Sequence, residues 1–158
     1  MYARRGAGAM AGSERIRTPH GHVVVETDGE TVRRISLKRG TARTEASSAL
    51  AADLRRYLTG EAVTFSRYDV DYESYTPFER SVLEATREIP WGETRTYGEI
   101  AAAIGKPGAA RAVGQALGKN RTCIVVPCHR VVATNGLGGF TGGLQWKRDL
   151  LALEGSLP

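Results

Sequence analysis

The sequence predicts an α/β N-terminal half followed by a mostly helical C-terminal half. Three observations predict this arrangement: an Asp-Gly turn at residues 28–29 between two β-branched runs, Thr-x-x-Glu capping boxes at Thr76 and Thr96, and two short helical segments joined by a glycine-containing turn. We divide the chain into a flexible arm, an α/β subdomain and a C-terminal domain, at residues 1–18, 19–75 and 76–158.

The composition is that of an ordinary globular chain of 158 residues, 41% hydrophobic and 25% charged. The sequence has no apolar run of about 18 residues that would cross a membrane, and its Arg- and Gly-rich N-terminus lacks the apolar core of a secretory signal. We therefore expect a cytoplasmic protein. The net charge of +5 is weak support for a polyanionic partner, but residues 91–130 hold six basic side chains against two acidic ones. That cluster indicates either a binding surface or a solvated face.

In the N-terminal half, residues 22–37 predict the two strands of a β-hairpin, because Asp-Gly is a strong signal for a two-residue turn. Residues 47–59 place apolar side chains on one helical face, with Gly60 after them, and predict a helix. Residues 61–73 have a mixed pattern that is typical of a strand followed by a linker.

In the C-terminal half, the capping box at residues 76–79 has proline at the first helical position and predicts a helix that ends at Pro90. The box at residues 96–99 begins a short helix, and residues 109–117 form a second one after a tight turn. Such a pair is typical of a helix-turn-helix. The small residues of the second helix suit close approach to another surface or ordinary helix packing equally well.

The remaining segments are short. Residues 123–126 are rich in β-branched side chains and predict a buried strand, and residues 145–154 predict a closing helix. Residues 136–143 form a glycine-rich loop that suits a cover over a ligand. The loop lacks both the Gly-Lys-[Ser/Thr] ending of a phosphate-binding loop and the third glycine of the dinucleotide fingerprint, so we predict no nucleotide cofactor.

The motif Val-Val-Pro-Cys-His-Arg-Val-Val places Cys128 between a proline and two basic residues in an apolar stretch. A cysteine attacks as the thiolate, which His129 and Arg130 would favour, and Pro127 would break the strand so that the thiol can face a pocket. His129 reaches the sulfur only if the backbone turns or a water bridges the two groups. Glu154 is the candidate acceptor that would orient the imidazole. An inert buried thiol is the alternative.

The other cysteine, Cys123, lies five positions before Cys128 in the same apparent strand, so the two thiols are expected to face opposite sides and not to pair. The sequence lacks the paired Cys/His spacing of a zinc site, and we interpret His20 and His22 as surface residues of the arm. We expect two free thiols and no bound metal.

The motif Ile-Val-Val-Pro-Cys-His-Arg-Val-Val is preceded by Arg111 and Asn120 and followed by Gly-Gly-Phe-Thr-Gly-Gly and Leu-Leu-Ala-Leu-Glu-Gly. With the stretch from Thr94 to Gly114, it resembles the O6-alkylguanine-DNA alkyltransferases. The resemblance is strong over residues 76–155 and covers the N-terminal part only in outline. It implies a ribonuclease H-like small sheet with a helix in the N-terminal half and a DNA-binding helix-turn-helix in the C-terminal half.

The resemblance implies DNA repair by direct reversal of damage. The alkyl group of O6-alkylguanine, with O4-alkylthymine as a further candidate, would pass irreversibly to Cys128 after the base is flipped out of the duplex. Each molecule would act once, without a cofactor, as a monomer bound to the minor groove of double-stranded DNA.

For catalysis, the resemblance implies Cys128 as the nucleophile and alkyl acceptor, and His129 as its base through a water. Glu154 would orient the imidazole, and Asn120 would brace the site. Tyr97 would donate a hydrogen bond or a proton to N3 of the guanine as it leaves.

For substrate binding, the resemblance implies that Arg111 enters the duplex and replaces the flipped nucleotide. The carbonyls of Cys128 and Val131 would accept from the exocyclic amine of the base. The N–H of Thr141 would meet O6, and Phe140 would wall the pocket where the family often has tyrosine. The rest of the surface for the DNA and the base would be Ala109, Ala110, Ala112, Gly114 and Gly142.

Two departures and three alternatives accompany this interpretation. No cysteine precedes Cys123, so the zinc ligands of some family members have no counterpart, and Cys123 is expected to be a small core residue.

The main alternative is a non-enzymatic, alkyltransferase-like protein that binds lesions, but that group replaces the nucleophile, commonly with tryptophan. A cysteine hydrolase would leave the helix-turn-helix unexplained. A transcription regulator would need polar side chains where this helix has alanine and glycine.

Overall fold

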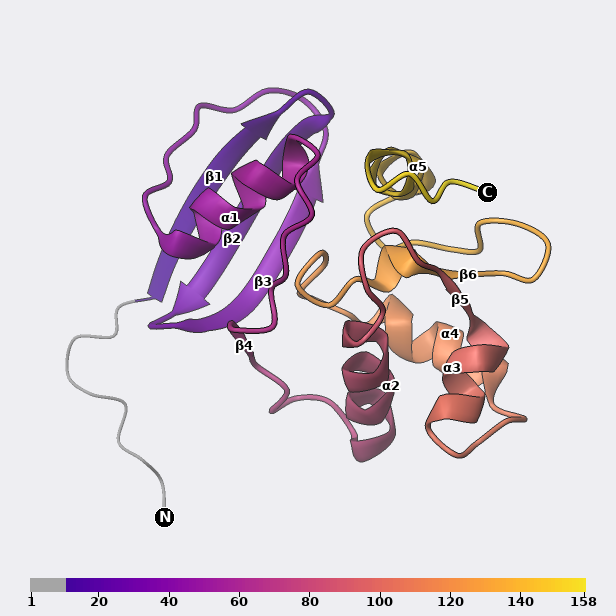
Figure 1. The fold of residues 1–158 in the computed structure, drawn as a ribbon. Helices are drawn as coiled ribbons and strands as arrows, with labels where there is room; N and C mark the ends of the chain where they lie inside the picture. Colours follow the sequence, from indigo (N-terminus) through magenta and orange to yellow (C-terminus); the bar gives the residue numbers. More distant parts are fainter. Residues whose placement is uncertain (1–10) are drawn as a thin grey trace, which may run out of the picture.

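The computed structural model describes residues 11–158, and Figure 1 shows a sheet with one helix beside a group of helices. The N-terminal half consists of β1 (Ala11–Thr18), β2 (Gly21–Asp28), β3 (Thr31–Lys38), α1 (Ala49–Leu58) and β4 (Asp69–Val70). The C-terminal half consists of α2 (Pro77–Arg87), β5 (Arg95–Thr96), α3 (Tyr97–Ala103), α4 (Ala110–Gly118), the single 3-10 turn η1 (Cys128–Arg130), β6 (Val131–Val132) and α5 (Leu144–Leu153).

The sheet has the order β1-β2-β3-β4, in which the first three strands are antiparallel and β4 joins in parallel. The predicted hairpin is confirmed, and its Gly29 has a φ of +61°, the left-handed conformation that such a turn requires. α1 packs on one face of the sheet (Figure 1). Val23, Val25 and Leu54 are fully buried between the two layers.

The prediction of a flexible arm over residues 1–18 is wrong for residues 11–18, which form the edge strand β1. Within β1, Ile16 is buried in the core while its neighbours Arg15 and Arg17 are exposed. A single inward apolar residue produces no period that a sequence can reveal, and charged side chains are common on edge strands because they discourage further pairing. Residues 1–10 lie outside the described part of the chain.

The two capping boxes are confirmed. The Thr76 hydroxyl accepts from the Glu79 N–H while the Glu79 carboxylate accepts from the Thr76 N–H, and Thr96 and Glu99 repeat the pattern. These bonds satisfy backbone donors at the start of α2 and α3 and so fix where each helix begins. The helices predicted after Gly108 and at the end of the chain are α4 and α5.

The two halves meet where β3 lies against the segment that precedes η1. The N–H of Ile35 donates to the carbonyl of Arg121 at 2.8 Å, and Ile35 forms a single parallel bridge with Thr122. The sheet thereby supports the backbone that leads to Cys128. Along residues 11–158, none of the helices has the length and the apolar character needed to span a bilayer.

Candidate active site

The backbone before Cys128 turns, so the predicted strand at residues 123–126 is wrong. The N–H of Val126 donates to the carbonyl of Thr122 at 2.9 Å, and Ile124 has a φ of +75°, a conformation that β-branched residues rarely adopt. The β-branched side chains here are buried in the core, but the backbone that carries them does not form an extended strand. The chain then makes the 3-10 turn η1, which breaks the alternation of a strand and gives Cys128 and its neighbours their directions.

Asn120 holds this turn closed. Its side chain is buried, its Nδ2 donates to the carbonyl of Val126 at 3.0 Å, and its Oδ1 accepts from the N–H of Thr122 at 3.0 Å. Both ends of the amide therefore bond to backbone that no strand satisfies. A buried turn needs such a partner, because each unpaired backbone group would be costly.

Cys128 is buried in an environment that favours its thiolate. A hydrogen bond from the Cys123 thiol lowers the pKa of Cys128, burial opposes this, and the Asn120 side chain and the charge of Lys147 lower it further. The expectation that the two cysteines face opposite sides is therefore wrong, because the turn brings both thiols to one side. Both are free. Cys123 is a partner of Cys128 as well as a core residue.

Behind Cys128 lies a buried carboxylate network centred on Glu154. Its Oε2 lies 2.5 Å from Nε2 of His129, and its Oε1 accepts from Nε of Arg130 at 2.6 Å. Burial alone would raise the pKa of Glu154, but the hydrogen bonds and charges of His129 and Arg130 outweigh it and lower the pKa to about 2. Arg130 thus stabilises Glu154, and its Nη1 donates to the carbonyl of Ile89 at 2.6 Å.

His129 is fully buried, and burial lowers the pKa of its imidazole, so the ring is neutral at physiological pH. If Nε2–H donates to Glu154, the lone pair is on Nδ1. Nδ1 is buried and has no hydrogen-bond partner among the described residues. The ring therefore offers a free proton acceptor. Along residues 11–158 no direct hydrogen bond joins it to Sγ of Cys128.

A cavity of about 710 Å³ opens on Cys128, a size that suits one small planar ligand. Helices α3 and α4 form one side, and the glycine-rich loop before α5 forms the other. The lining residues are Tyr97, Ala110, Arg111, Gly114, Leu117, Gly118, Cys128, Gly139, Phe140 and Thr141. The cavity therefore brings together the predicted nucleophile and most of the residues predicted to bind substrate.

The loop over this cavity is held from two sides. The hydroxyl of Thr141 donates to the carbonyl of Gly118 at 3.1 Å, and Nζ of Lys147 donates to the carbonyls of Gly139, at 2.9 Å, and Val131, at 2.7 Å. Lys147 is fully buried, and burial lowers its pKa to about 8. This role could not be predicted from the sequence, because a lysine on a helix is usually exposed.

Known proteins with similar sequences show which protein family this chain belongs to. Residues 77–156 match the family model described as the DNA-binding domain of 6-O-methylguanine DNA methyltransferase. A Methanosarcina acetivorans protein named methylated-DNA–protein-cysteine methyltransferase is 40% identical over 153 residues, which is 89% of this chain and 96% of that protein. The chain belongs to the 6-O-methylguanine DNA methyltransferase family.

Solved structures of this methyltransferase family share the fold. The Mycobacterium tuberculosis OGT in complex with DNA is 38% identical, with a TM-score of 0.80 over 91% of this chain and 93% of that one. The O6-methylguanine-DNA methyltransferase of the hyperthermophilic archaeon Pyrococcus kodakaraensis is 27% identical, with a TM-score of 0.73 over 92% and 99% of the two chains. The likeness extends over the N-terminal half, where the sequence resemblance was only an outline.

Some residues that the family resemblance had assigned to the site lie outside the cavity. Ala109 and Ala112 are half-buried on or beside α4 but do not line it. Gly142 lies between the Phe140 ring and Leu37. The carbonyl of Val131 already accepts from Lys147 and keeps one lone pair for another donor.

The sequence interpretation also missed a side chain from the N-terminal half that reaches the candidate site. Tyr57 of α1 is fully buried, and its hydroxyl donates to Oε2 of Glu154. The helical period had placed Tyr57 on the apolar face of α1 among leucines, where it looked like an ordinary core residue. Among residues 11–158, no group of three or more histidine, cysteine, aspartate or glutamate side chains is arranged to hold a metal ion.

Proposed function

We propose that this chain repairs DNA by direct reversal, transferring the alkyl group of O6-alkylguanine to Cys128 in one irreversible step. The observation that carries the proposal is a buried cysteine with a lowered pKa that opens on a cavity and is backed by the pair of His129 and Glu154. The family membership supports the same activity, that of a methylated-DNA–protein-cysteine methyltransferase. O4-alkylthymine is a further candidate substrate.

The transfer is an in-line displacement at the alkyl carbon. The Cys128 thiol gives its proton through a water to Nδ1 of His129, the sulfur–carbon bond forms, and the bond from that carbon to O6 breaks. Its electron pair leaves with the guanine, which a proton from Tyr97 neutralises. Burial raises the pKa of Tyr97, so its phenol remains protonated and able to donate. The thioether product is stable, and each molecule acts once.

The target base must leave the duplex to reach Cys128. We propose that α3 and α4 act as a helix-turn-helix on the minor groove, and that Arg111 fills the space of the flipped nucleotide. Arg111 is exposed at the mouth of the cavity, and its neighbours on α4 are small, as close contact with DNA requires. Readout through phosphates and the degenerate minor groove suits a protein that acts in any sequence.

The N-terminal half is proposed to be a ribonuclease H-like subdomain of residues 19–75, with the alkyltransferase domain over residues 76–158. The end of β4 at Val70 and the start of α2 at Pro77 support this division. The strand β1 adds residues 11–18 to the first unit.

The direct test is intact mass spectrometry after incubation with a duplex that carries O6-methylguanine. We expect the protein to gain one methyl group and the modified peptide to contain Cys128. An unmodified duplex is the control and should leave the mass unchanged. An unchanged mass combined with tight binding to the lesion would contradict transfer and favour the non-enzymatic lesion-binding protein.

Arg111→Ala should slow the repair of duplex DNA at least about tenfold. Flipping a base out of the duplex costs a few kcal/mol, and Arg111 would offset part of this cost by filling the space that the base leaves. The reaction with free O6-benzylguanine, which needs no flipping, should change less than about twofold. Both rates are read from time courses of the protein mass. Arg55→Ala, which removes an exposed charge from α1, is the matched control and should change neither rate. Equal slowing of both reactions by Arg111→Ala would mean that Arg111 has no part in flipping.

Gly138→Ala should slow transfer by roughly tenfold through the strain of a non-glycine residue in a left-handed conformation and a clash. Gly138 has a φ of +71°, and a Cβ there would overlap the hydroxyl and ring of Tyr97. The loop or the phenol must then move from its place in the cavity. Gly136→Ala, in the same loop but with open space around its Cα, should react at the wild-type rate. Similar rates for both variants would show that the contact with Tyr97 is unimportant.

A further inference from the structure

The carboxylate that orients His129 is shared with a side chain from the other half of the molecule. The hydroxyl of Tyr57 donates to Oε2 of Glu154, the oxygen that also faces His129, and its oxygen lies 3.2 Å from Nε2 of that histidine. Tyr57 and Glu154 are 97 positions apart in the chain. The contact therefore depends on how the two halves dock and not on any local motif.

Glu154 has three donors when this contact is counted. Oε1 accepts from Arg130, and Oε2 accepts from both His129 and Tyr57. A carboxylate next to an imidazole draws a proton onto the ring, and each further donor to the same oxygen weakens that pull. Burial raises the pKa of Tyr57 well above its ordinary value, so the phenol remains a neutral donor wherever the protein is folded. It stabilises the carboxylate without adding a charge.

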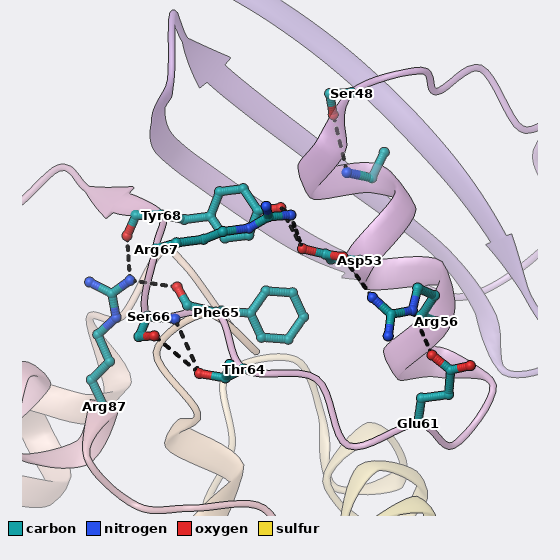
Figure 2. A network of polar contacts seen from close by, with 11 residues as sticks. Ser48, Asp53, Arg56, Glu61, Thr64, Phe65, Ser66, Arg67, Tyr68 and Arg87 are labelled. Atoms are coloured by element: carbon teal, nitrogen blue, oxygen red, sulfur yellow. Dashed lines mark hydrogen bonds and ion pairs between the residues drawn. The ribbon is translucent and has the colours of Figure 1, made fainter.

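The ring of Tyr57 is held in one orientation. It makes edge contacts with Phe65, at a centroid distance of 5.8 Å, and with Trp91, at 5.4 Å. Arg87 of α2 donates to the carbonyl of Phe65 at 2.9 Å, so the loop that carries Phe65 is tied to the C-terminal half (Figure 2). The hydroxyl is thus aimed at Glu154 by packing.

The same face of α1 is also fixed one turn earlier. Figure 2 shows Asp53, one turn before Tyr57, accepting from Arg67 at 2.5 Å and from the hydroxyl of Tyr68 at 2.6 Å. These bonds hold α1 against the loop that follows it. A rotation of α1 would break these bonds, so they fix the position of the Tyr57 hydroxyl relative to Glu154.

We propose that Tyr57 is a positioning residue for the proton transfer from Cys128. Its hydroxyl donates to Oε2 of Glu154 and so reduces how strongly this carboxylate stabilises a protonated His129. Nδ1 of His129 therefore stays unprotonated and can accept the proton of Cys128. The inference rests on the proposed function for its catalytic meaning, while the contacts that carry it stand independently. It gives the N-terminal half a part in the chemistry.

Among residues 11–158, the charged and titratable groups that act on His129 include Glu154 and Lys147 from the α5 region, Arg130 from the same turn, and Tyr57 from α1. The neighbouring Cys128 is the thiol whose proton His129 would accept. Tyr57→Phe removes one hydroxyl and leaves the ring, its packing and the other three groups in place. The effect of Glu154 on the imidazole then increases, and His129 should hold its proton to a higher pH.

The test is the pH dependence of single-turnover methyl transfer from a saturating O6-methylguanine duplex. In Tyr57→Phe the midpoint of the acid limb should move up by about one pH unit, the effect of losing one hydrogen bond to a charged group, while the rates converge at high pH. Tyr68→Phe is the matched control, because it removes a phenol–carboxylate bond of the same kind from Asp53. It should leave the profile unchanged.

A second readout does not depend on activity. The NMR chemical shifts of the His129 ring, assigned with a His129→Gln variant, should titrate at a higher pH in Tyr57→Phe than in the wild type. An unchanged titration, or a rate that falls equally at every pH, would overturn the inference. If the wild type takes no methyl group, the proposed function fails, and the titration still decides whether Tyr57 controls His129.

Discussion

Replacing Cys128 with serine is expected to abolish alkyl transfer while the protein keeps its fold and its affinity for lesion-containing DNA. A hydroxyl has a far higher pKa than a thiol, and the neutral His129 cannot generate an alkoxide from it in useful amounts. The rate should fall at least about a thousandfold, as it does when other enzymes lose their nucleophile. Mass spectrometry of the protein over time measures the transfer, and fluorescence anisotropy with a labelled duplex measures binding.

Cys123→Ser makes the same change one turn away and is the matched control. It replaces a weak S–H donor to Cys128 with an O–H donor, so transfer should stay within about tenfold of the wild-type rate. The methyl group should remain on Cys128. A methyl group found on Cys123 in the wild type, or normal transfer by Cys128→Ser, would show that the assignment of the nucleophile is wrong.

Glu154→Gln is expected to lower the free energy of unfolding by about 3–5 kcal/mol, because it leaves the buried charge of Arg130 unpaired. Urea denaturation at neutral pH measures this loss. The matched control is Glu84→Gln, which removes the partner of Arg80 in an exposed pair one turn apart on α2. Such a pair contributes little, so the control should lose less than about 1 kcal/mol.

Acid should bring the stabilities of the wild type and Glu154→Gln closer together. The pKa of Glu154 is lowered from 4.5 to about 2 in the folded protein, so its contribution to stability is complete above about pH 4.5 and is lost as the pH falls towards 2. Wild type should lose roughly 3 kcal/mol over that range from this group, a loss that Glu154→Gln lacks. Parallel stability curves for the two proteins between pH 5 and pH 2 would mean that Glu154 is not held ionised by its partners.

The elements that the sequence predicted well are those with local signals. The Asp-Gly turn fixes the hairpin of β2 and β3, and the capping boxes at Thr76 and Thr96 fix the starts of α2 and α3, because each signal involves residues at most three apart. β1 was missed because Ile16 alone among its described side chains is buried in the core. The turn before Cys128 was missed because β-branched residues are typical of strands, and the buried amide of Asn120 overrides that preference.

The candidate site divides in the same way. Cys128, Arg111, Tyr97 and Phe140 were predicted through a family motif, and the structure places them on one cavity. Their individual roles remain predictions. Tyr57 and Lys147 were not predicted, because each reaches the site across the fold and neither lies at an informative spacing. A polar atom on an otherwise apolar helical face was the one available signal for Tyr57.

Because Tyr57 and Glu154 are far apart in the sequence, their contact determines at which stage of folding the site around Cys128 is completed. Contacts between residues 97 positions apart form late, since closing so large a loop costs entropy that only the docked halves can offset. The turn that gives Cys128 its reactive environment is itself supported by β3. Until the two halves dock, Cys128 is therefore expected to have the ordinary pKa of an exposed thiol. The environment that lowers its pKa is complete only when the protein is fully folded, so the thiol gains its heightened reactivity last.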